Sequence, residues 1–217
     1  MTPKTEEELR KIAKARGVRY EPIPDPDPLV VRTQMSKIFG IGQDDFFSSF
    51  ADPMAHVPLF SIIKSSTPPI RYGIQEVLPE NQFFAFEHVE EGNLPPRIML
   101  VKYTLKRPTL ITKEAVTNPF VGTDKDPEPS TPAPTREPKK KKGPIEPYDK
   151  KKGIVLMRFT KVTSNRTRLT TTSIFHAETG SIFARRFIDA VWLNFYERMM
   201  VINGTLKESE MQTGPMR

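Results

Sequence analysis

IFARRFIDAVWLNFYERMMVINGTL, residues 182–206, is the stretch that decides the fold. Its apolar residues recur at every fourth position, and two more widen the stripe: Phe183, Phe187, Val191, Phe195 and Met199, with Ile188 and Trp192 beside them. This spacing predicts one long helix with a continuous apolar face, capped at its start by Ser181. At 1.5 Å per residue the helix would be roughly 35–40 Å long, enough to lie across a whole small domain.

Closely spaced strands come before this helix. Alternating apolar and polar residues predict eight of them, at residues 29–35, 60–66, 70–78, 82–90, 97–105, 109–117, 154–163 and 166–176. Short turns such as Ser164-Asn165 connect most of these strands, which is typical of an antiparallel meander. The sequence therefore predicts an α+β fold, in which six to eight antiparallel strands curve around a long C-terminal helix.

The N-terminal 28 residues are expected to form an arm and a proline-rich linker. Thr5 and Glu8 have the spacing of a capping box, which predicts a short helix from Thr5 to Arg16. Few apolar residues lie in this helix, so we expect it to dock loosely. Four prolines between Pro22 and Pro28 predict an extended linker. The folded domain is then expected to cover residues 29–210.

A phenylalanine-rich stretch, FFSSFADPMAHVPLF at residues 46–60, predicts two short helices. Phe46, Phe47 and Phe50 share one face of a helix at residues 43–50. Asp52 is a suitable N-cap and Pro53 a suitable first residue for the second helix.

The positive charge of the chain is concentrated in one segment. The chain has 217 residues and a formal net charge of +7, and residues 136–152 alone carry eight basic and three acidic side chains. Residues 119–152 also contain eight prolines, which predicts a disordered insertion in the domain. Its two lysine runs are most simply a solvated linker, or contacts for an anionic membrane surface or a protein partner: Lys139, Lys140, Lys141, Lys142, Lys150, Lys151 and Lys152. Neither lysine run contains an aromatic residue, so a nucleic-acid partner is not expected.

Four stretches resemble the START-like helix-grip superfamily, which includes lipid-transfer domains, polyketide cyclases and coenzyme Q-binding proteins. Phe50-Ala51-Asp52-Pro53 with Val57-Pro58 resembles its helix–turn–helix, and His88 to Arg97 resembles its strand–turn–strand with a proline pair. Residues 165–170, NRTRLT, resemble its penultimate turn, and residues 182–206 resemble its closing helix. The insertion departs from the pattern, because loops of the family are usually short at that place.

The resemblance implies an apolar cavity between the sheet and the last helix. Strand phase and the resemblance together predict that cavity's lining, with His88 and Tyr103 as its polar contacts: Tyr72, Phe84, Phe86, His88, Met99, Val101, Tyr103, Leu169 and Phe187. A few convergent polar groups in an apolar pocket are typical of small-molecule sites. The expected ligand is a lipid, sterol, quinone or polyketide-like compound.

No catalytic or metal-binding motif stands out. The chain has no cysteine and only three histidines, His56, His88 and His176, which do not cluster with acidic residues. Ser48 and Ser49 have no evident base, and no glycine-rich phosphate loop is present. Arg158 is expected to point outward, although its apolar neighbours leave open a contact with a ligand carboxylate or phosphate.

Three functions therefore stay open. The first is binding or transport of an apolar small molecule without a cofactor. The second is an interaction or assembly subunit with a basic docking loop. The third is a cyclase- or dehydratase-like enzyme that uses His88 and Tyr103, although a non-enzyme is favoured. The sequence contains no membrane span or signal peptide, so we expect a cytoplasmic protein.

Overall fold

The computed structural model of the chain describes residues 5–51, 70–78, 81–89, 97–115, 153–176 and 181–213. Three helices and eight strands make up most of this part: α1 (Glu6–Ala15), β1 (Arg19–Ile23), β2 (Val30–Phe39), α2 (Gln43–Ala51), β3 (Ile70–Leu78), β4 (Gln82–Val89), β5 (Arg97–Lys106), β6 (Leu110–Ala115), β7 (Ile154–Thr163), β8 (Arg166–His176) and α4 (Ser181–Ile202). The second helix expected at Asp52-Pro53, the strand at 60–66 and the insertion at 119–152 lie outside the described residues.

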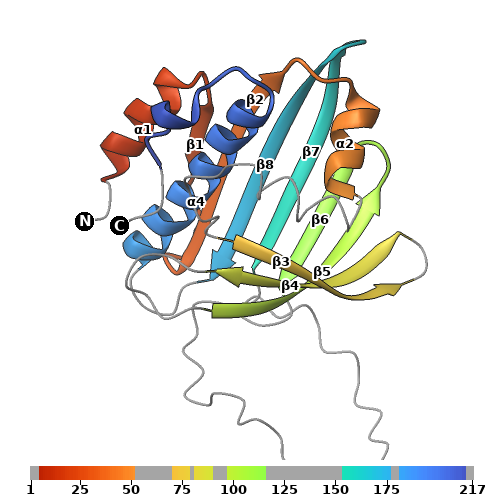
Figure 1. Cartoon of the computed structure of the whole chain (residues 1–217). Helices are drawn as coiled ribbons and strands as arrows, with labels where there is room; N and C mark the ends of the chain where they lie inside the picture. Colours follow the sequence, from red (N-terminus) through yellow and green to blue (C-terminus); the bar gives the residue numbers. More distant parts are fainter. Residues whose placement is uncertain are drawn as a thin grey trace, which may run out of the picture.

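All eight strands belong to one antiparallel sheet, in the order β1-β2-β8-β7-β6-β5-β4-β3. Strands β3 to β8 follow one another as a meander, and β2 closes the arrangement by pairing with β8 over its whole length. Figure 1 shows the sheet curving so that α4 lies across its concave face. The α+β helix-grip architecture predicted from the sequence is therefore confirmed.

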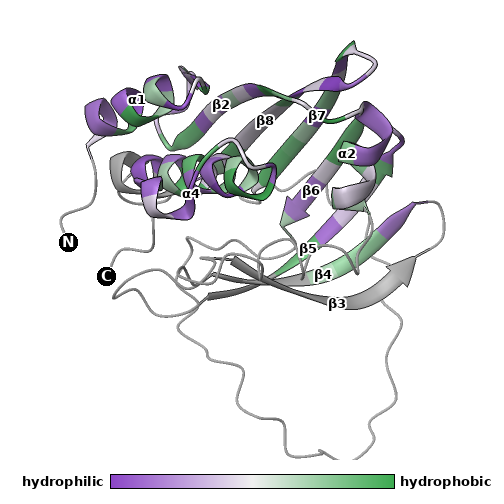
Figure 2. Ribbon diagram, turned by 45° about the horizontal axis from the view of Figure 1, so that its top comes forward, coloured by the Kyte–Doolittle hydropathy of each residue, from purple (hydrophilic) through white to green (hydrophobic). Residues whose placement is uncertain are grey.

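Pairing across the strands defines two faces of the sheet. Residues that stand opposite each other point to the same side, as Met35, Thr171, Met157 and Ile111 do in successive strands. These four residues are buried, so their side is the inner face, which is covered by the helices. Their neighbours along each strand belong to the outer face, and Figure 2 shows the resulting alternation of hydrophilic and hydrophobic residues along β2, β8 and β7.

Helix α4 forms where the apolar stripe predicts it, but both of its ends differ from the expectation. It begins at Ser181 itself instead of after it, and it ends at Ile202 instead of Leu206. Gly204 has a φ of +73°, and the amides of Thr205 and Leu206 both donate to the carbonyl of Met200. This left-handed glycine cap turns the chain out of the helix, so Leu206 packs on the core from outside it.

The expectation of a loosely docked N-terminal helix is wrong. Leu9 and Ala13 of α1 are each 1% exposed, because this short apolar stripe lies against α4. The predicted capping box is present: the hydroxyl of Thr5 accepts from the amide of Glu8, and the Glu8 carboxylate accepts from the amide of Thr5. Strand β1 then pairs with β2, so the sheet already begins within the residues expected to form the arm.

A second apolar helix covers one end of the inner face. Phe46, Phe47 and Phe50 of α2 are buried, and their rings lie 5.3 to 5.8 Å from the ring of Phe159 on β7. Phe50 also contacts Phe195 of α4, with ring centroids 5.7 Å apart. This aromatic cluster fills the space between α2, α4 and β7, as the phase of the three phenylalanines predicted.

A buried polar network fixes the end of the described chain to α4. The carboxylate of Glu197 is fully buried and accepts from the amides of Gln212 and Thr213 and from the guanidinium of Arg16. Asn194, one turn earlier, donates to the carbonyl of Thr213. These bonds satisfy backbone groups of residues 212–213, which would otherwise be costly to bury.

Candidate ligand-binding site

The inner face of β4 and β5 is the centre of the candidate site. Phe83 stands opposite Tyr103, and Ala85 stands opposite Val101. All four side chains are at most 3% exposed. The rings of Phe83 and Tyr103 stack with centroids 4.4 Å apart and planes 11° apart. The inward positions predicted for Val101 and Tyr103 are therefore confirmed.

Phe84 does not belong to this site, contrary to the prediction. It stands opposite Lys102, on the outer face, and it is partly exposed. The prediction chose the wrong phase because QFFAF, residues 82–86, carries aromatic residues in both phases. Pairing with β5 places Phe83 and the small Ala85 on the inner face, opposite Tyr103 and Val101. The sequence of β4 alone does not reveal this register.

Leu169 is buried on the inner face but lies away from Tyr103. It is on β8 and stands opposite Phe159, beside the aromatic cluster. Three strand spacings of about 4.8 Å separate β8 from β5, which is about 14 Å along the sheet. Leu169 therefore contributes to the packed core between α2 and α4.

The other predicted lining residues have their backbones in β3, β4, β5 and α4, but their side chains lie outside the described part of the chain: Tyr72, Phe86, His88, Met99 and Phe187. His56 lies outside the described part of the chain altogether. In the register of β4, Phe86 and His88 have the phase of Phe84 and stand opposite Leu100 and Ile98, so their positions belong to the outer face and the prediction that they line the site is wrong. The places of Tyr72, Met99 and Phe187 in a site remain predictions.

Lys113 is the site residue that the sequence analysis missed. It stands opposite Tyr103 on the inner face of β6, and it is only 6% exposed. Its ammonium nitrogen lies 5.2 Å from the centre of the Tyr103 ring, within the range of a cation–π interaction. The signal was present in the sequence, because Ile111, Lys113 and Ala115 share one phase of the strand.

The polar groups under α4 serve the fold. The hydroxyl of Tyr196 is buried and donates toward the carbonyls of Met35 and Leu169, 3.0 and 3.2 Å away. Burial raises the pKa of Tyr196, so the hydroxyl stays protonated. It therefore links α4 to β2 and β8 and is not poised for proton transfer.

A second buried pair joins α4 to the edge of the sheet. The hydroxyl of Tyr20 on β1 donates to Oδ2 of Asp189, at 2.5 Å. Asp189 is 1% exposed, and burial raises the pKa of its carboxyl group despite the hydrogen bond from Tyr20. Burial and the nearby Asp189 carboxyl likewise raise the pKa of Tyr20.

The arrangement offers apolar contacts and few reactive groups. In the described ranges, no group of three or more His, Cys, Asp or Glu residues lies together as a metal site would require. Among those same ranges, no helix is both long and apolar enough to cross a membrane. Arg158 is exposed on the outer face, opposite Leu110 and Thr170, as the sequence indicated.

Solved structures with the same architecture include polyketide aromatase/cyclases. The Zhui aromatase/cyclase from Streptomyces sp. R1128 is 12% identical, with a TM-score of 0.51, and the match covers 80% of this chain and 96% of that one. The di-domain ARO/CYC StfQ from the steffimycin biosynthetic pathway is 11% identical, with a TM-score of 0.53, and the match covers 83% of this chain and 52% of that one. No protein-family model and no curated protein sequence matches the chain. At these identities the likeness shows the helix-grip fold alone, as the resemblance to the START-like superfamily implied.

Proposed function

We propose that the chain binds an apolar small molecule on the inner face of β4, β5 and β6. The observation that carries this proposal is the position of the buried residues Phe83, Val101, Tyr103 and Ile111. In the described part of the chain the helices pack mainly on β1, β2, β7 and β8, and these residues continue the same apolar core toward β4 and β5. Tyr72 and Met99, whose register positions continue the row of Ala85 and Val101, and the predicted lining residue Phe187 would extend the same site.

Tyr103 and Lys113 are the proposed polar contacts. An ammonium group held near an aromatic face on an apolar wall suits a ligand with a carboxylate, an enolate or a carbonyl at one end. A charge-assisted hydrogen bond to such a group is worth about 1.5–3 kcal/mol, enough to fix the orientation of a flexible apolar molecule.

Binding is favoured over catalysis in this proposal. A cyclase or dehydratase needs a proton donor or acceptor within reach of its substrate, and neither of the two proposed polar contacts is a histidine, the side chain that most often transfers protons near neutral pH. The aromatase/cyclases of the same fold make a polyketide-like ligand reasonable.

Native mass spectrometry of protein purified from its own source tests the proposal directly. We expect a co-purifying apolar molecule at up to one equivalent per chain. The fluorescent fatty acid cis-parinaric acid then serves as a probe for saturable binding. A chain that carries no small molecule and binds no probe contradicts the proposal, and a stoichiometric protein bound instead supports an assembly subunit.

Paired variants locate the site. Val101→Phe fills the inner face of β5, so we expect it to weaken probe binding at least tenfold while the melting curve stays cooperative. Leu100→Phe makes a similar enlargement at the neighbouring position, which alternates to the outer face, and should leave binding unchanged. Equal effects of the two variants would place the probe elsewhere.

A further inference from the structure

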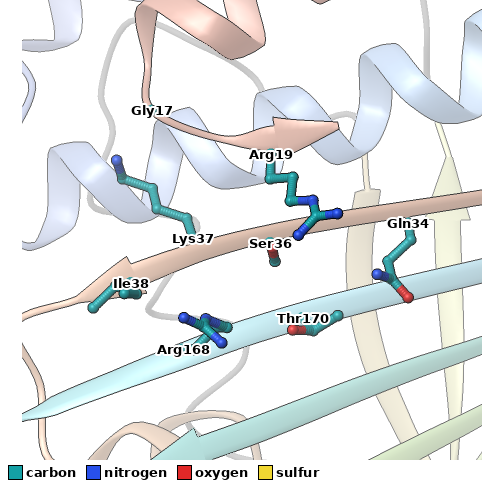
Figure 3. Close-up of a pocket in the computed structure, with 8 residues that line it drawn as sticks. All are labelled: Gly17, Arg19, Gln34, Ser36, Lys37, Ile38, Arg168 and Thr170. Carbon is teal, nitrogen blue, oxygen red and sulfur yellow. The ribbon is translucent and has the colours of Figure 1, made fainter. Parts of the chain in front are cut away.

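A polar groove lies on the outer face of the sheet, on the side away from the proposed ligand site. Its volume is about 450 Å³, within the range of small-molecule sites. Strands β1, β2 and β8 form it, and Figure 3 shows the side chains that line it: Arg19, Gln34, Ser36, Lys37, Arg168 and Thr170.

The strand register explains why these side chains converge. Arg19 stands opposite Ser36, and Ser36 stands opposite Thr170, so the three form one row across the sheet. Arg168 is two residues from Thr170 and therefore points to the same face. In Figure 3 the guanidinium groups of Arg19 and Arg168 lie on either side of the Ser36 hydroxyl.

The groove has hydrogen-bond donors that the fold does not use. Among the described residues, no hydrogen bond or ion pair engages the side chain of Arg168, Ser36 or Thr170. Arg19 pairs with Glu21 at 3.3 Å, but both side chains are largely exposed, so the pair is weak and can exchange. Lys37 differs, because its ammonium group donates to the carbonyl of Arg16 and points away toward Gly17.

The surrounding surface carries a strong positive charge. Residues 153–176 contain four basic residues, Arg158, Lys161, Arg166 and Arg168, and no acidic residue. Arg158 stands opposite Thr170 and extends the row toward β7. Glu21, which stands opposite Gln34, is the acidic group closest in register to the groove. An anion is therefore attracted to this face.

We infer that the groove binds the phosphoryl group of an anionic ligand. The guanidinium groups of Arg19 and Arg168 lie on either side of the Ser36 hydroxyl, and Thr170 lies beside Arg168 on β8. A carboxylate is satisfied by one bidentate arginine, whereas a phosphoryl group has enough oxygen acceptors to bond both arginines and a hydroxyl at once. The phosphoryl group belongs either to a soluble phosphate compound or to a lipid headgroup.

Titration calorimetry with sodium pyrophosphate as the probe, at about 20 mM and 150 mM NaCl, tests the site on the full chain. We expect saturable binding that weakens about tenfold in Arg168→Gln and in Arg19→Gln. Arg166→Gln removes the same charge two residues from Arg168, outside the groove, and should lower the affinity less than twofold.

The outcomes separate a site from a general charge effect. Equal losses in Arg166→Gln and Arg168→Gln, or no saturable binding at 20 mM NaCl, overturn the inference. Sedimentation with phosphatidylcholine vesicles, with and without phosphatidic acid, identifies the source. Binding to pyrophosphate alone indicates a soluble ligand, and Arg168-dependent binding to the phosphatidic acid vesicles indicates a headgroup. Failure of this test leaves the apolar site untouched, because none of the groove residues belongs to it.

Discussion

The guanidinium of Arg16 and the carboxylate of Glu197 meet at 2.7 Å, although the two residues are 181 positions apart in the sequence. Arg16 ends α1, and Glu197 lies in the second turn from the end of α4. Because the same carboxylate accepts from the amides of Gln212 and Thr213, one side chain holds both ends of the described chain on α4.

Glu197→Gln should therefore destabilise the protein strongly. The amide cannot accept from all of these donors, and Arg16, whose side chain is 14% exposed, loses its counter-charge. Breaking one partner of a buried pair costs about 3–5 kcal/mol, which urea unfolding would measure. Glu7→Gln removes an exposed pair with Lys11 and should change stability by less than about 0.5 kcal/mol. Similar urea unfolding midpoints for Glu197→Gln and Glu7→Gln would contradict the stabilising role assigned to Glu197.

Asp189 should make stability fall as pH rises. Its carboxyl pKa is raised by burial, so between the unfolded value, near 3.9, and the raised folded value the native state binds more protons than the unfolded state. Stability is then lost from about pH 4 upward until the folded pKa is passed. Asp189→Asn cannot ionise, so its stability relative to the wild type should increase across this window. Parallel stability profiles of the two proteins from pH 4 to 8 would show that the group does not titrate in this way.

Phe159→Ala should show how much the aromatic cluster contributes to the stability of the protein. The ring is 1% exposed and contacts three phenylalanines of α2, so its loss leaves a cavity. Truncations of this kind cost about 3–5 kcal/mol. Val162→Ala on the same strand, at a side chain 41% exposed, should cost less than about 0.5 kcal/mol. Calorimetric melting of both variants compares their losses of stability. A small loss for Phe159→Ala would mean that neighbouring side chains move in to fill the cavity.

Lys113→Met should change ligand preference more than stability. The substitution keeps length and apolar volume but removes the ammonium group above Tyr103. If the proposed site takes a carboxylate, cis-parinaric acid should bind about tenfold more weakly, which corresponds to roughly 1.4 kcal/mol, while its methyl ester should bind as before.

Lys102→Met, on the outer face of β5, is the matched control for Lys113→Met and should alter neither affinity. Equal weakening of the acid and the ester would assign Lys113 a packing role only.

Strong periodic signals in the sequence were enough to predict the architecture. The repeating apolar residues predicted α4 correctly, although residues 192–200 are buried on every side of the helix, and the alternation in β5 predicted the phase of Val101 and Tyr103. Phe83 and Phe84 are both aromatic, so only the pairing with β5 decides which of them is buried. Choosing between two such phases needs the register, which is a property of two strands together.

Two other features depended on tertiary contacts. Three apolar residues in α1 looked too few for firm packing, but their contact with α4 buries them fully. Lys113 was passed over because charged residues are rarely buried, and its inward position follows from the phase of Ile111 and from the partner Tyr103. In both cases the local sequence pattern was visible, but whether the side chains are buried depended on a partner element elsewhere in the chain.

The pairing of β2 with β8 also determines when the molecule can fold. The hydroxyl of Ser173 donates to the carbonyl of Thr33, 140 positions earlier in the sequence. During synthesis, β2 must wait for nearly the whole chain before its partner strand exists, whereas β3 to β6 can pair as they emerge. Proteins dominated by such distant pairings fold in milliseconds to seconds, so joining β2 to β8 should be the rate-limiting event and should leave the first strands dependent on chaperones until translation is complete.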